Sequence, residues 1–80
     1  MEHSVQAYIK RQPTQMLWGL LRWFMATKER TYTNQDNIRL ALEELEKRYN
    51  DASEEVPASV EQAWNEFLEC MAEMTEAQYQ

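Results

Sequence analysis

The chain has 80 residues, of which 44% are apolar, and this length allows one small domain. Its formal net charge of −6 argues against direct nucleic-acid binding, which relies on Lys and Arg to replace counterions along the phosphates. Its single cysteine, Cys70, excludes an internal disulfide, so the chain needs no oxidising compartment and a cytoplasmic location is expected.

A short first helix is predicted from Ser4, which is a suitable N-cap residue. Val5, Tyr8 and Ile9 follow at helical spacing and share one face. Pro13 disfavours helical backbone at the residue before it and is well suited to the first turn of a new helix. We therefore expect a corner at residues 12–14.

The second helix is predicted from about Pro13 to Lys28 or Arg30, with basic residues in its last turn, where the helix dipole favours them. Its segment MLWGLLRWFM, which spans residues 16–25, has apolar side chains around almost the whole helix circumference. A helix of this kind is expected to be buried on all sides. Its longest apolar run is interrupted by Arg22 and is too short to span a bilayer, so no membrane segment is expected.

The third helix is predicted to begin after Thr33 as the N-cap, with Asp36 as the acidic partner of a capping box. Its apolar positions repeat at helical spacing and are Ile38, Ala41, Leu42, Leu45 and Tyr49. On its outer side, ion pairs are expected between Glu43 and Lys47 and between Glu44 and Arg48.

Residues 50–59 have the composition of a loop, and Ser59 with Gln62 predicts a capping box for the last helix, which should reach about Ala77. A broad apolar stripe follows, made of Val60, Ala63, Trp64, Phe67, Leu68, Met71 and Met74. The sequence thus predicts one all-α domain over residues 1–80, a compact bundle of three main helices plus a short N-terminal helix. The second helix is expected at its centre, with the last helix packed across it.

The most informative signal is steric, because the second helix carries more apolar surface than one face can bury. With Met16, Leu20 and Trp23 turned to the bundle, the opposite side becomes a protein-binding patch made of Trp18, Leu21, Arg22 and Met25, with Leu40 as a possible neighbour. The alternative is that the first helix and the tail ending at Tyr79 fold over that side.

The last helix also carries an acidic ridge of Glu66, Glu69, Glu73 and Glu76, expected opposite its apolar stripe. A solvated face explains these residues. As an alternative, the ridge opposes Arg or Lys on a partner, imitating a row of phosphates.

Catalytic and metal chemistry are not expected. The only histidine, His3, lies at a terminus that is expected to fray, and Cys70 is expected as a partly buried packing residue. No Glu-x-x-His pair of a di-metal bundle is present in the sequence, and no cofactor is expected.

The sequence therefore predicts a small acidic cytosolic protein-interaction module rather than an enzyme. It is expected to self-associate, or to dock through the apolar helix on a partner with a basic or apolar surface. Two alternatives remain open: an acidic inhibitor that mimics DNA on a nucleic-acid-binding protein, and an antitoxin-like partner of a basic protein.

Overall fold

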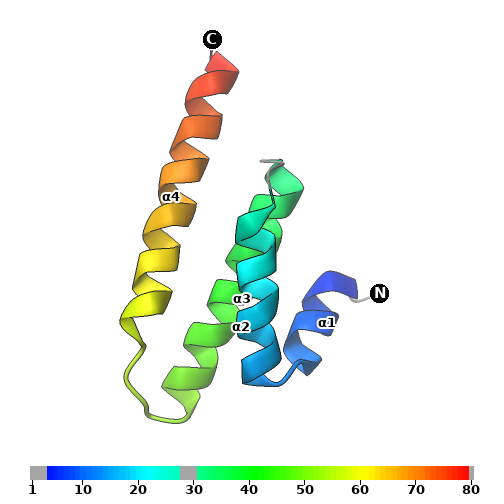
Figure 1. Ribbon diagram of the computed structural model, residues 1–80, viewed down its shortest axis with the longest axis vertical. Helices are drawn as coiled ribbons and strands as arrows, with labels where there is room; N and C mark the ends of the chain where they lie inside the picture. The colour runs from blue at the N-terminus through cyan, green and yellow to red at the C-terminus, as the bar shows by residue number, and fades with distance from the viewer. Residues whose placement is uncertain (1–3, 28–30, 80) are drawn as a thin grey trace.

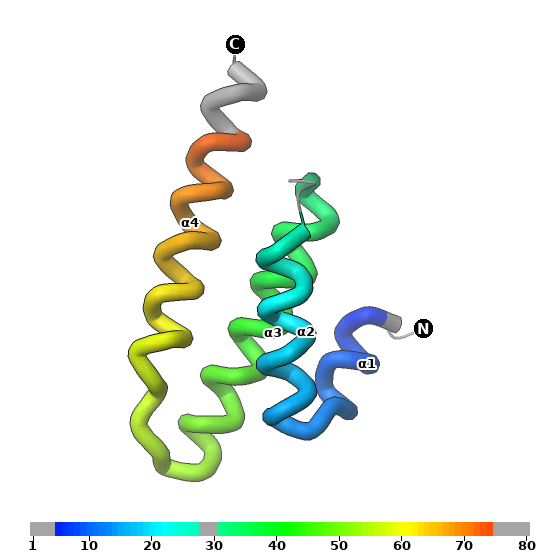
Figure 2. Tube along the Cα trace, viewed as in Figure 1, coloured from blue at the N-terminus to red at the C-terminus, as the bar shows by residue number. Residues whose placement is uncertain are grey.

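The computed structural model describes residues 4–27 and 31–79, with side chains described at 5–27 and 31–74. This part of the chain forms four helices and no strand: α1 (Ser4–Arg11), α2 (Thr14–Ala26), α3 (Tyr32–Asp51) and α4 (Ala58–Tyr79). Helices α2, α3 and α4 run alternately up and down, and the short α1 lies beside α2 and α3 (Figure 1, Figure 2). The predicted all-α bundle with a short N-terminal helix is confirmed. None of the described helices combines the length and apolarity needed to cross a membrane.

The corner between α1 and α2 lies where Pro13 predicts it. The backbone N–H of Gln12 donates to the carbonyl of Ile9 at 3.2 Å, and Pro13 is extended, with φ −60° and ψ 152°. Helix α2 ends at Ala26, because Thr27 is already extended. It is therefore shorter than expected, and Lys28 and Arg30 lie outside the described residues.

Helix α3 begins one residue after Thr31, so the expected N-cap at Thr33 is wrong. The hydroxyl oxygen of Thr31 accepts from the backbone N–H of Asn34 at 3.1 Å. Asp36 takes no part in capping, because its carboxylate pairs with Arg39 at 2.7 Å, and this hydrogen bond raises the pKa of Arg39. Two threonines two residues apart are equally good caps by type, and local pattern does not separate them.

The connection between α3 and α4 is shorter than the predicted loop. Helix α3 continues to Asp51 and is closed by Ser53 in the left-handed region, with φ 57°, while the N–H of Glu54 donates to the carbonyl of Tyr49. Helix α4 already begins at Ala58, so Ser59 lies inside its first turn and the expected capping box is wrong.

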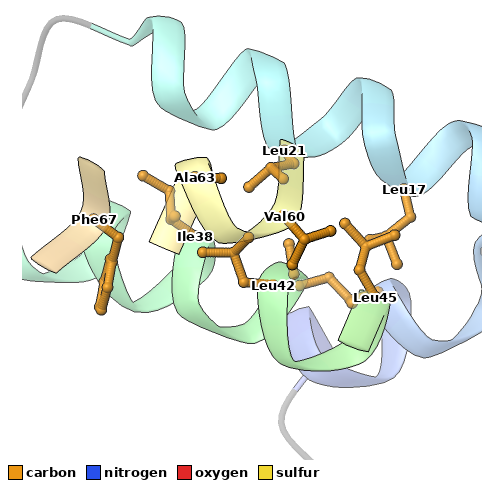
Figure 3. Close-up of a cluster of buried hydrophobic side chains, with 10 residues drawn as sticks. Leu17, Leu21, Ile38, Leu42, Leu45, Val60, Ala63 and Phe67 are labelled. Atoms are coloured by element: carbon orange, nitrogen blue, oxygen red, sulfur yellow. The ribbon is translucent and has the colours of Figure 1, made fainter. Parts of the chain in front are cut away.

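The core is built mainly from α2, α3 and α4 (Figure 3), and α1 contributes Ile9. Leu17 and Leu45 lie toward one end, and Ile38 and Phe67 toward the other. Periodicity identified most of this set correctly. The buried apolar residues are Ile9, Leu17, Leu21, Ile38, Ala41, Leu42, Leu45, Val60, Ala63 and Phe67.

Helix α3, rather than α2, is the central element, because α1, α2 and α4 all pack against it. Arg48 connects α3 to the corner between α1 and α2. Its guanidinium donates to the carbonyl of Lys10 at 3.1 Å and to the hydroxyl of Thr14 at 3.3 Å. A cation at the C-terminal end of α1 also complements the helix dipole.

Two ion-pair predictions on α3 had different outcomes. Glu44 and Arg48 pair at 2.9 Å as expected. The expected pair of Glu43 with Lys47 is wrong, because Glu43 pairs with Arg39 and Lys47 pairs with Asp51. The hydrogen bond to Asp51 raises the pKa of Lys47.

Candidate protein-interaction site

Helix α2 is turned the opposite way from the sequence-based expectation. Leu21, expected on the exposed patch, is 2% exposed and lies in the core, while Met16 and Trp23, expected against the bundle, are exposed. The apolar side chains of α2 spread over most of its circumference, and only Gln15 and Arg22 mark a narrow polar side, so several rotations of the helix bury apolar residues. Its rotation is settled by packing against α3, which no local pattern reports.

The exposed apolar surface of α2 is its outer face, which we define as Met16, Gly19, Leu20 and Trp23. Trp23 is 66% exposed, Met16 is 59% exposed and Leu20 is half-buried. The three apolar side chains stand at i, i+4 and i+7 and therefore share one side of the helix. Apart from the adjoining backbone of its own helix and its two chain neighbours, a Cβ atom added to Gly19 would meet nothing within 4 Å, so the backbone is open to close approach there.

The indole of Trp23 is held by its neighbour. Its ring lies 5.7 Å from that of Phe24, centroid to centroid, at an interplanar angle of 59°. Phe24 is half-buried against the core. The exposed indole is thus restrained from one side, which lowers the conformational entropy that a partner would need to restrict.

Part of the predicted patch lines a groove instead of a protruding face. Trp18, Leu21 and Arg22 border a groove of about 500 Å³ with Ser59 and Ala63 of α4. Trp18 and Met25 are half-buried against the core, and only Arg22 is exposed as expected. Ser59 and Ala63 of α4 therefore face part of the side of α2 that was expected to be open.

Leu40 is not brought to this groove. It is half-buried and lines two other grooves on the α1 side of α3, one of them with Gln6, Ile9 and Lys10. Leu40 therefore faces the first helix, which explains why it does not share the core face of Leu42.

Three members of the acidic ridge are solvated, and they also border a groove that reaches buried residues. Glu66, Glu69 and Glu73 are exposed, and in the described part of the chain they form no ion pair. The side chain of Glu76 lies outside the described residues. The three carboxylates line a groove of about 260 Å³ together with Met25, Gln35, Ile38, Phe67 and Cys70.

Gln35 is a feature that sequence reasoning missed. It is 1% exposed, and neither Oε1 nor Nε2 of its side chain has a hydrogen-bond partner among the described residues. It lines the groove of about 260 Å³ bordered by the three glutamates, which we call the acidic groove. It also lines a groove of about 650 Å³ on the α1 side of α3. The available signal was its spacing of three residues from Ile38, which extends the core stripe of α3 by one turn.

Cys70 is half-buried, as expected for a packing residue, and His3 lies outside the described residues. Among the side chains at 5–27 and 31–74, no group of three or more His, Cys, Asp or Glu residues is placed to hold a metal ion.

Comparisons with known proteins bring no relative: no family model, no curated protein and no solved structure matches the chain.

Proposed function

We propose that this protein is a small interaction module that pairs with a second copy of itself through the outer face of α2. The main observation in support is that Trp23 is 66% exposed, on the same face of α2 as an exposed Met16, in a chain of only 80 residues. Large exposed apolar side chains that form a continuous surface mark association sites, and Trp is the residue type most enriched in binding hot spots.

The spacing of the outer face suits an antiparallel two-fold pair. In such a pair, two positions exchange partners across the axis. An axis beside Gly19 and Leu20 sets Met16 of one copy against Trp23 of the second copy, because these positions are equally far from it in sequence. Gly19 then allows the two helix backbones to approach closely.

The charge distribution also favours this face. Helix α2 carries one charged side chain, Arg22, whereas residues 36–80 hold twelve acidic and three basic side chains. Pairing through α2 therefore keeps the acidic half of each copy away from the axis and avoids like-charge repulsion. A cytoplasmic location fits the proposal, because the lone cysteine requires no oxidation.

The test compares two Glu substitutions at similarly exposed apolar residues. Trp23→Glu is expected to weaken self-association at least about 30-fold, since hot-spot residues contribute about 2 kcal/mol or more. Leu68→Glu, at a side chain of α4 that is 57% exposed, is the matched control and should leave association unchanged. The measurement is sedimentation equilibrium over a dilution series, with circular dichroism to confirm the fold. An equal loss in both variants, or a monomeric wild type, would contradict the proposal.

A further inference from the structure

A second surface differs in composition from the outer face of α2. It is a groove with acidic side chains along one side and apolar side chains at its base, which we call the apolar floor. Helix α4 supplies Glu66, Glu69 and Glu73 along one side of the groove of about 260 Å³ described above. Its apolar lining comes from three helices: Met25 of α2, Ile38 of α3 and Phe67 of α4. The carboxylates are exposed and have no cation beside them within the described part of the chain.

The side chain of Gln35 gives this groove its second, independent feature. Gln35 lines the groove and is 1% exposed. Both polar atoms of its side chain are unpaired among the described residues. An unpaired buried amide is unfavourable, and native proteins rarely retain one without a reason. Phe67 lines the same two grooves as Gln35.

The hydrogen-bonding capacity and charge of the groove's side chains indicate which ligand it can bind. An amide with both atoms unpaired needs a donor for Oε1 and an acceptor for Nε2. An ammonium group only donates and a carboxylate only accepts, whereas the main chain of an extended peptide offers both, because its own hydrogen bonds are unmade. The three carboxylates favour Lys or Arg side chains beside that main chain. The small apolar floor favours one apolar side chain of the ligand.

We propose that this groove binds an extended, basic segment of another protein, whose main chain pairs with the amide of Gln35. One apolar side chain of the segment enters the space between Met25, Ile38 and Phe67, and its flanking cations meet the carboxylates of α4. This surface shares no residue with the outer face of α2, so the two proposals succeed or fail separately.

The probe is a synthetic acetylated and amidated heptapeptide with a central leucine flanked on each side by three lysines. Calorimetric titration at about 150 mM salt, where charges farther than about 8 Å are screened, should show saturable binding of one peptide per chain. In parallel, the side-chain amide resonances of Gln35 should shift in a nitrogen–proton correlation spectrum. Replacing the central leucine by glycine should weaken binding about tenfold, because the apolar floor then stays unfilled.

Two matched pairs of substitutions separate this site from a general attraction of opposite charges. Glu66→Gln with Glu73→Gln removes two carboxylates of the groove and should weaken peptide binding about tenfold. Glu54→Gln with Glu55→Gln removes the same charge from the exposed connection between α3 and α4, and should change the affinity by less than about twofold. Equal weakening by both pairs would overturn the proposal.

Gln35→Met tests the amide itself with a side chain of similar length. The variant should raise the thermal midpoint of unfolding, because it buries no unpaired polar atom, and should bind the peptide about tenfold more weakly. Unchanged peptide affinity in this stable variant, or Gln35 amide resonances that stay in place on saturation of the wild type, would overturn the proposal. A dimer that dissociates on Glu66→Gln with Glu73→Gln would also overturn it, by making a second copy the occupant.

Discussion

Trp23 and Gln35 each occupy an environment opposite to the usual preference of their residue type. Trp23 is 66% exposed, and Gln35 is 1% exposed with an unpaired amide. An exposed large apolar group and a buried polar group are the informative departures from ordinary burial, whereas a buried Leu is expected. Each residue marks one of the two surfaces for which we propose a partner.

Gly19 offers a test in which stability and association change in opposite directions. Apart from the adjoining backbone of its own helix and its two chain neighbours, an alanine Cβ at this position would meet nothing within 4 Å in the isolated chain. Gly19→Ala should therefore stabilise the monomer by about 1 kcal/mol, because alanine loses less backbone entropy in a helix. In the proposed pair, the added methyl groups separate the two backbones, so the dimer should weaken.

Two measurements test this. Urea unfolding, at a protein concentration well below the dissociation constant of the dimer, reports the stability of the monomer. Sedimentation at high protein concentration reports association. A variant that gains stability and keeps the dimer unchanged would place the paired surface away from Gly19.

At the scale of the helices, Arg48 joins three elements through a single side chain. Its guanidinium contacts Glu44 in α3, the carbonyl of Lys10 at the end of α1, and Thr14 at the start of α2. The side chain is 22% exposed and that of Glu44 is 13% exposed, so solvent screens this pair less than the others on α3. Arg48 therefore fixes how the corner at Pro13 sits on the central helix.

Arg48→Met should lower the free energy of unfolding by about 1–3 kcal/mol, since it removes several hydrogen bonds to a charged group and leaves Glu44 unpaired. Lys47→Met, which breaks an exposed pair with Asp51, should leave the urea midpoint unchanged. Urea unfolding followed by circular dichroism measures both. Equal effects of the two substitutions would show that Arg48 acts only as a surface charge.

The orientation of the helix with one narrow apolar stripe, α3, was predictable, and that of α2, with its broad apolar surface, was not. In α3, the spacing of Ile38, Leu42 and Leu45 identified the buried side correctly, because the other side is charged. In α2, only Gln15 and Arg22 mark a polar side, so the pattern did not separate Leu21 from Trp23 clearly. The sequence analysis consequently expected Leu21 on the exposed side of α2, whereas Met16 and Trp23 are exposed there.

Other departures come from contacts between residues distant in the sequence. Leu40 was expected as a possible neighbour of the patch on α2, but it lines grooves on the α1 side of α3. The acidic groove could not be found from α4 alone, because Met25 and Gln35 come from two other helices. The sequence pattern placed residues on helices, and only their packing brought them together.

For the whole molecule, the arrangement around α3 leaves an elongated particle. Its radius of gyration is 13.3 Å, against about 12 Å expected for a compact chain of this length. The C-terminal part of α4 extends beyond the ends of α2 and α3 (Figure 1). A small domain buries a limited share of its surface, so the association of two copies through α2 would add apolar burial that the fold alone does not supply.

The most direct test of the pairing through α2 is an isotope-filtered nuclear Overhauser measurement on an equal mixture of labelled and unlabelled chains. The account predicts intermolecular contacts between the indole protons of Trp23 in one copy and the methyl protons of Met16 in the second copy. A spectrum in which Trp23 shows contacts only within its own chain, or in which intermolecular contacts arise from α4 instead, would contradict it.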